Sequence, residues 1–220
     1  MRGRKLEALV PAAGLSARMG DFKPLLDLGG RALIVRTVES LFRGGVSLVT
    51  VVLGFRGDEL EELLGREFGG SGEGPGLRFV RNRDFAVSDM LWSIRLGLGA
   101  VGGPFFLLPA DMPAVRGETL RGLAEFALAE GERRGPDSPG RLLVSFPAGE
   151  GGRRGHPPLI EAPCIPLIQA WQGGGGLRGF WESLGQGIAL FPAGDPGCFM
   201  DADTPADYLR LKEYLCGKGH

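Results

Sequence analysis

Lysine, cysteine and histidine are all scarce in this chain of 220 residues. The three cysteines, Cys164, Cys198 and Cys216, form no CxxC pair, so neither a zinc knuckle nor a disulfide framework is indicated. This cysteine usage is typical of a reducing compartment, and we expect a cytoplasmic protein. The first apolar run is broken by Glu7 and Pro11, which makes it too short for a membrane span and poor as a signal segment.

The chain also has no large excess of positive or negative charge. The formal net charge is −1, which argues against a nucleic-acid partner, since such proteins normally present a basic face. His156 is the only internal histidine, which excludes a histidine-based metal cluster. Only four of the 25 basic residues are lysines, and Lys23 is the only lysine between residues 6 and 211. Its placement, in a chain that otherwise uses arginine, is consistent with a role for a compact point charge.

Strand and helix patterns alternate along the chain. Apolar runs predict buried strands at residues 6–11, 47–54, 77–82, 104–113 and 141–148. Amphipathic stretches predict helices at residues 31–45, 57–68, 89–101, 117–131 and 204–215. Continuous apolar strands separated by helices are typical of a mostly parallel sheet that is covered on both faces. We therefore predict a three-layer, Rossmann-like α/β fold that forms a single domain over residues 1–220.

The first predicted strand ends in a loop of small and basic residues, "LVPAAGLSARMGDFK" (9–23). Ligands commonly bind to α/β folds at this edge of the sheet, where backbone N–H groups with Arg18 and Lys23 can hold phosphate. The spacing fits neither a Walker A loop, nor a dinucleotide GxGxxG motif, nor a hydrolase GxSxG elbow. The alternative is a tight turn with a solvated arginine. The two basic residues together favour phosphate binding.

Aspartates follow this loop at two later points of the chain. The segment "FFLLPADMP" places Asp111 just after a buried strand, and "CFMDADTPADY" offers Asp201 and Asp203 before a helix that Thr204 caps. Carboxylates beside a phosphate loop suit Mg²⁺, which bridges phosphate oxygens and offsets their charge. The alternative is that these aspartates cap turns or complement the dipole of a helix.

Four motifs give the chain a resemblance to a known family. The segments "PAAGLSARMGDFK", "DMP", "GHP" and "DADTP" resemble the MobA/MocA-like nucleotidyltransferases, and most of all their molybdenum cofactor cytidylyltransferase branch. The resemblance covers residues 6–215 and implies a nucleotidyltransferase fold with a mostly parallel, mixed sheet. The run Ala-Ala-Gly-Leu-Ser is similar to the cytidine-selective form of the loop, whereas the guanosine-selective form is Ala-Gly-Gly-Arg-Ser.

The resemblance also implies a role for each residue of the site. The residues expected to line the base and ribose are Ala12, Ala13 and Gly14, with Ser93 as a further nucleotide contact. The residues expected to hold the triphosphate are Ser16, Arg18 and Lys23, and the last two would also stabilise the leaving pyrophosphate. The residues expected to hold Mg²⁺ are Asp111, Asp201 and, next in order, Asp203. The residues expected on the acceptor side are Gly155 and His156.

Two segments depart from the family pattern. Asp89 and Leu91 stand where small residues are usual, and Trp92 is bulky. The segment 171–181 carries no acid before its arginine, where the family often has one. Both departures bear on the acceptor and leave the nucleotide half of the pattern intact.

We therefore expect an Mg²⁺-dependent nucleotidyltransferase. It would transfer a nucleoside monophosphate, with CTP as the favoured donor, to a phosphorylated small molecule such as molybdopterin, and release pyrophosphate. One alternative is a sugar-phosphate nucleotidyltransferase, although the longer Gly-x-Gly-[ST]-R loop of those enzymes is absent. Another is a nucleotide-binding accessory protein for a molybdoenzyme partner, with little turnover.

Overall fold

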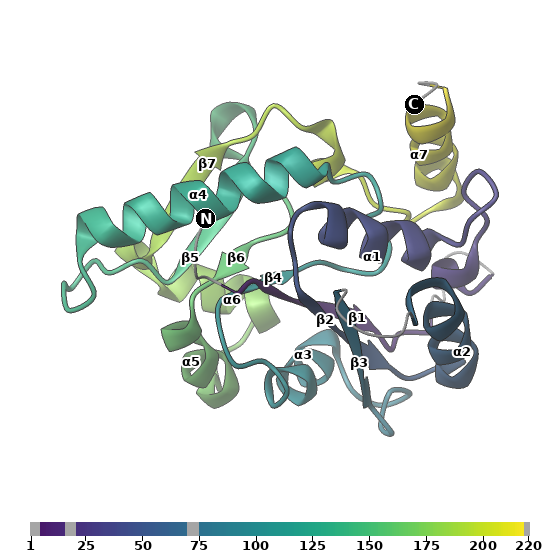
Figure 1. Cartoon of the computed structure of the whole chain (residues 1–220). Helices are drawn as coiled ribbons and strands as arrows, with labels where there is room; N and C mark the ends of the chain where they lie inside the picture. The colour runs from purple at the N-terminus through teal and green to yellow at the C-terminus, as the bar shows by residue number, and fades with distance from the viewer. Residues whose placement is uncertain (1–4, 16–20, 70–74, 218–220) are drawn as a thin grey trace.

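A computed structural model describes residues 5–15, 21–69 and 75–217 of the chain. These residues form a seven-stranded sheet with the order β3-β2-β1-β4-β6-β5-β7 (Figure 1). The strands are β1 Glu7–Ala12, β2 Leu48–Leu53, β3 Gly76–Arg81, β4 Phe105–Leu107, β5 Val144–Ala148, β6 Leu159–Ile160 and β7 Ile188–Pro192. Four pairings are parallel, and the short β6 runs antiparallel to both of its neighbours, β4 and β5. The predicted mostly parallel, mixed sheet is thereby confirmed.

Helices cover both faces of the sheet (Figure 1). The helices that pack on one face are α1 Leu33–Arg43, α2 Gly57–Phe68 and α4 Gly117–Arg134. The helices that pack on the other face are α3 Met90–Leu98, α5 Ile165–Ala170 and α6 Gly176–Ser183. Helix α7, Pro205–Cys216, lies outside these layers and packs through Leu211 against Leu33 at the start of α1. Among the described residues, no helix is both long enough and apolar enough to span a membrane.

The alternation of side chains along β1 builds a separate core on each face. Ala8 and Val10 are buried under one helical layer, and Leu9 is buried under the other. Gly97 lets α3 come close to the sheet, because a Cβ atom there would lie 2.3 Å from Leu9 Cδ1 and 2.8 Å from Val52 Cγ2. This close packing fixes α3 against β1 and β2, so its N-terminal end lies beside the loop that follows β1.

The secondary-structure predictions are confirmed for most elements. The helix predicted over residues 57–68 has those bounds, and the closing helix begins after its predicted cap, Thr204. The strand predicted over residues 104–113 is much shorter, because the chain turns away at Pro109, which has no N–H group to continue the ladder. Strands β6 and β7 and helices α5 and α6 were not predicted.

Asp195 connects the segment after β7 to the start of α4. Its buried carboxylate accepts hydrogen bonds from the N–H of Arg116 at 2.9 Å, from Thr119 Oγ1 at 2.8 Å and from the N–H of Gly197 at 3.0 Å. We expect Asp195→Ala to lower the free energy of unfolding by about 2–4 kcal/mol, because three donors lose a buried carboxylate that accepts from all of them. Urea unfolding measures this change, and the exposed Asp137→Ala serves as a control with an effect below about 0.5 kcal/mol. Equal losses in the two variants would contradict the capping role.

Candidate active site

The site lies at the edge of the sheet where β1 and β4 end side by side. The two strands are parallel neighbours, with Leu9 opposite Leu107, and the N–H of Leu108 donates to the carbonyl of Leu9 at 3.1 Å. The loop after β1 and the turn that carries Asp111 therefore leave the sheet together. This adjacency is what the placement of both motifs after buried strands predicted.

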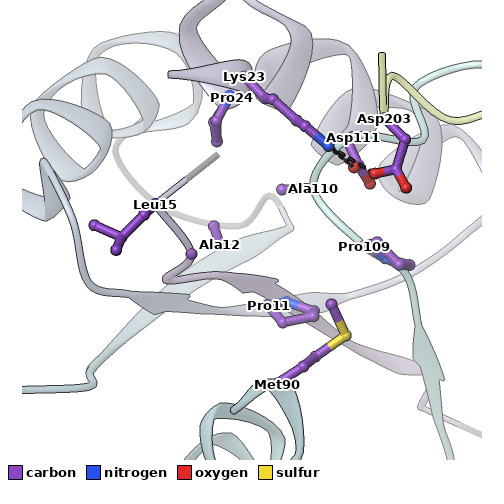
Figure 2. A pocket seen from close by; sticks show the side chains of 11 residues that line it. Pro11, Ala12, Leu15, Lys23, Pro24, Met90, Pro109, Ala110, Asp111 and Asp203 are labelled. Carbon is purple, nitrogen blue, oxygen red and sulfur yellow. Dashed lines mark hydrogen bonds and ion pairs between the residues drawn. The ribbon is translucent and has the colours of Figure 1, made fainter. Parts of the chain in front are cut away.

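A cavity of about 450 Å³ opens between these two segments (Figure 2). Its walls come from the ends of β1 and β4, from the segment around Lys23, from the start of α3 and from Asp203, two residues before α7. The residues that line it are Pro11, Ala12, Gly14, Leu15, Lys23, Pro24, Met90, Pro109, Ala110, Asp111 and Asp203. Five segments of the chain thus meet around one opening, as expected for a ligand site at the switch point of an α/β sheet.

Lys23 is the only basic residue in the described lining of this cavity. It begins the short 3₁₀ helix Lys23–Leu25, in which Pro24 sets the first turn, and its side chain is only 12% exposed. The Nζ atom lies 2.7 Å from Oδ1 of Asp203 and 3.3 Å from Oδ2 of Asp111, and Figure 2 shows the side chain pointing at both carboxylates. Lys23 therefore bridges two aspartates that are 92 positions apart in the sequence.

Backbone contacts hold the two aspartate segments together. The N–H of Ala202 donates to the carbonyl of Asp111 at 3.2 Å, and the N–H of Asp203 donates to Oδ1 of Asp201 at 3.1 Å. After them, Thr204 and Asp207 form a capping box at the start of α7. Asp207 is therefore a helix cap, whereas Asp203 faces the cavity and Asp201 is not part of its lining.

Burial and like charge shape the electrostatics of this cluster. Burial raises the pKa of Asp111 above its usual value; the positive charge of Lys23 opposes this rise, and the charges of Asp203 and Asp201 add to it. Burial lowers the pKa of Lys23, but the hydrogen bond to Asp203 and the charge of Asp111 outweigh it, so the pKa of Lys23 is raised. One lysine thus offsets the repulsion between the carboxylates only in part.

The donor set of this cluster suits a hard divalent cation. Asp111 and Asp203 offer carboxylate oxygens at the mouth of the cavity, which is the ligand type that Mg²⁺ and Mn²⁺ prefer. Within the described ranges, no three His, Cys, Asp or Glu side chains are grouped so that they could hold a metal by themselves. Mg²⁺ sites commonly use one or two carboxylates together with substrate phosphates and water. The residues present therefore fit a metal that is shared with a phosphorylated ligand, once Lys23 turns away from them.

A smaller cavity of about 250 Å³ adjoins the first. The two cavities share Pro11, Gly14 and Met90, so they form one continuous site along the loop after β1. The further residues that line the smaller cavity are Ala13, Phe85, Ser88, Asp89 and Ser93. The alanines and the glycine of the loop, together with Ser93, thus line these two cavities, and their contact with a nucleotide stays a prediction.

Gly155 and His156 take part in a different contact. They do not line either cavity; the N–H of Gly155 donates to the carbonyl of Pro147 at 2.7 Å, and that of His156 to the carbonyl of Cys198 at 2.8 Å. Burial lowers the pKa of His156, although the negative charge of Asp201 acts in the opposite direction. His156 is therefore placed behind the aspartate segment, and its predicted contact with an acceptor stays a prediction.

Sequence reasoning placed part of this site and missed another part. Ser16 and Arg18, both assigned to the triphosphate, lie outside the described residues. Met90, which both cavities share, and the buried Asn82 behind the smaller one were given no role. Asn82 is the polar last residue of the strand predicted at residues 77–82 and directly follows β3, and polar residues at strand ends are a signal that could have indicated it.

Comparison with known proteins decides the family. The profile of the MobA-like NTP transferase domain matches residues 8–188. The chain belongs to this family. A MobA-like transferase is a nucleotidyltransferase, and the enzyme class predicted from the sequence is thereby confirmed.

Individual relatives of the MobA-like family cover nearly the whole chain. The molybdenum cofactor cytidylyltransferase of Escherichia coli (strain K12) is 25% identical over 214 residues, which are 94% of this chain and 96% of that protein. A nucleotidyl transferase from Methanothermobacter thermautotroptrophicus is 30% identical, with a TM-score of 0.78 over 99% of this chain and 100% of that one. A protein from Mycobacterium tuberculosis H37Rv, solved in complex with manganese, shares the fold at 20% identity, with a TM-score of 0.64 over 96% and 99% of the two chains.

Proposed function

We propose that this MobA-like transferase moves CMP from CTP to a phosphorylated small molecule such as molybdopterin, as a single domain that requires Mg²⁺. The observation that carries the proposal is the position of Lys23, between Asp111 and Asp203, at the mouth of a cavity bounded by the loop after β1. The choice of CTP is supported by the Ala-Ala-Gly-Leu-Ser form of the loop and by the cytidylyltransferase activity in the name of the Escherichia coli relative. The choice of acceptor is supported by that same relative.

The chemistry follows from charge and position. An acceptor phosphate oxygen attacks the α-phosphorus of CTP, a new phosphorus–oxygen bond forms, and the bond to the β-phosphate oxygen breaks so that pyrophosphate leaves with the electron pair. Asp111 and Asp203 would hold the metal ion, which when bound neutralises charge on the phosphate oxygens. Lys23 turns from the two carboxylates to the leaving pyrophosphate, and we assign Arg18 to the same task. No covalent intermediate is needed, since positioning and charge stabilisation supply the catalysis.

A pyrophosphate-release assay tests this function. The purified protein is mixed with CTP, GTP, ATP or UTP, each with molybdopterin and Mg²⁺, with a matched series in EDTA. We expect the fastest release with CTP, its loss in EDTA and its return when Mg²⁺ is added in excess. Release of pyrophosphate with sugar phosphates but not with molybdopterin would show that the acceptor is a sugar phosphate. Nucleotide binding without any release would favour an accessory protein and overturn the proposed activity.

A further inference from the structure

Asn82 holds two hydroxyl groups at the wall of the smaller cavity. It follows β3 directly, is 2% exposed, and its N–H donates to the carbonyl of Leu53 at 2.7 Å. Its side-chain oxygen accepts a hydrogen bond from the N–H of Asp84 at 3.0 Å. Its side-chain nitrogen donates to Ser88 Oγ and Ser93 Oγ, both at 2.9 Å. Because the N–H of Asp84 can only donate, it fixes the amide orientation, and both hydrogens of the amide nitrogen point to the serines.

This arrangement decides what the serines can offer a ligand. Each hydroxyl already accepts a hydrogen bond from Asn82, so its own hydrogen is left to donate. Within the described residues, neither Ser88 nor Ser93 donates that hydrogen to another group. Both residues line the smaller cavity. That cavity therefore presents two hydrogen-bond donors close together, since both oxygens are bonded to the same nitrogen.

We propose that Asn82 is a positioning residue that makes the site selective for cytosine by setting Ser88 and Ser93 as a pair of donors. This inference rests on the proposed nucleotidyl transfer and concerns the base of the donor nucleotide. Cytosine carries two adjacent acceptors, O2 and N3, on one edge. In uracil the N3 atom carries a hydrogen, so one serine would have to turn its hydrogen away and leave it without an acceptor. Sites that use hydrogen bonds in this way discriminate strongly between similar ligands.

The size of the cavity agrees with a single-ring base. Its volume is about 250 Å³, and Ala13 and Phe85 are among its walls. Guanine also carries two adjacent acceptors, O6 and N7, on a larger double ring, so GTP is the competing ligand that the experiment must include. Either base fits a cavity of this volume, so the choice of cytosine follows the Ala-Ala-Gly-Leu-Ser form of the loop, and the binding measurements decide between the two bases.

Equilibrium binding of nucleotides tests the inference without knowledge of the acceptor. Isothermal titration of CTP, UTP, GTP and 3-deaza-CTP, which lacks the N3 acceptor, is carried out with Mg²⁺ on the whole chain. We expect CTP to bind at least about tenfold more tightly than UTP and 3-deaza-CTP, the ratio for one lost hydrogen bond. Ser88→Ala and Ser93→Ala should each weaken CTP by about tenfold, and the variant of the serine that faces N3 should leave UTP nearly unchanged. Ser47→Ala, at the opposite edge of the sheet, is the matched control and should change neither.

Asn82→Asp tests the positioning role itself. The carboxylate has the same shape but can only accept, so the serine hydrogens turn toward it and their oxygens face the cavity as acceptors. The ratio of CTP to UTP affinity should then fall by about tenfold or more, a change that general loss of packing does not produce because it would weaken both nucleotides alike.

Each outcome of these titrations bears on a distinct claim. Equal affinities for CTP and UTP, tightest binding of GTP, or serine variants that weaken CTP and UTP equally would each overturn the inference, while nucleotide binding itself stands. If no nucleotide binds the unmodified chain, the proposed function fails instead. Should Asn82→Asp not fold, the two serine variants decide the question.

Discussion

Replacement of Asp111 by asparagine is expected to remove nearly all nucleotidyl transfer while leaving the fold intact. The carboxylate lies at the mouth of the cavity, 3.3 Å from Lys23 Nζ, and we assign it to the metal. Asparagine has the same shape but no charge, so it holds a divalent cation weakly. The rate of pyrophosphate release from CTP should fall by at least about 100-fold, since a metal stabilises transition-state charge by several kcal/mol.

The same variant should be slightly more stable than the unmodified chain when metal is absent. Burial raises the pKa of Asp111, so the carboxyl ionises less readily in the folded chain than in the unfolded chain. Its ionisation therefore costs folding free energy at neutral pH, and this cost disappears when the pH falls below the pKa of the unfolded carboxyl. Thermal unfolding at pH 7.5 in EDTA should show a higher midpoint for Asp111→Asn, and the difference should shrink as the pH falls toward 4.

A matched control separates the effect of this site from loss of an aspartate in general. Asp58 pairs with Arg81 at 2.8 Å on the exposed start of α2 and lines neither cavity. Asp58→Asn should release pyrophosphate at the normal rate. Full activity of Asp111→Asn with an unchanged requirement for Mg²⁺ would refute the metal assignment.

Replacement of Lys23 by methionine is expected to have the second large effect. Methionine keeps most of the length and the apolar part of the side chain but removes the charge that we assign to the pyrophosphate. The kcat/KM for CTP should fall by about 100-fold, the scale on which single electrostatic contacts to a transition state act. Without the lysine, Asp111 and Asp203 lose the ammonium group that lies between them, so the variant should unfold at a lower temperature in EDTA.

Added metal should reverse that loss of stability. We expect Mn²⁺ alone to raise the unfolding temperature of Lys23→Met more than that of the unmodified chain, because the ion no longer competes with a bound ammonium group. Lys212→Met, on the exposed face of α7, provides the control and should behave like the unmodified chain in both assays. If CTP kinetics were unchanged in Lys23→Met, the lysine would have no part in handling the triphosphate.

The helices and strands with a regular apolar pattern could be predicted from the sequence. Helix α2 and the strands β1 to β3 follow apolar periods of at least six residues, and their predicted bounds are within two residues of those observed. Strand β6 has only two residues, between Pro158 and Glu161, so it has no period to detect. Helices α5 and α6 are short and lie among glycines and prolines that read as loop, and their packing on β5 and α3 decides their structure.

Two residues of the candidate site could be predicted from the sequence. Lys23 and Asp111 were assigned from their places after predicted strands together with the family resemblance, and the structure brings them together. The sequence favoured Asp201 over Asp203, whereas the side chain that lines the cavity is that of Asp203. That choice depends on how the turn before α7 folds, because the N–H of Asp203 engages the carboxylate of Asp201 and so orients both residues. Local sequence does not specify such a turn.

The direction of strand β6 bears on which segment of the chain can change in sequence beside the candidate site. Because β6 is antiparallel to β4 and β5, it begins at the edge of the sheet where the parallel strands end. The segment 149–158 therefore crosses the edge that carries the cavities, yet neither cavity takes a residue from it. We expect insertions near the turn Glu150–Gly152 to reshape the surface beside the nucleotide half, whereas a larger residue at Gly155 would meet Phe199 and the carbonyl of Cys198. We expect this reversed strand to let the surface on the proposed acceptor side vary while the walls of the two cavities stay in place.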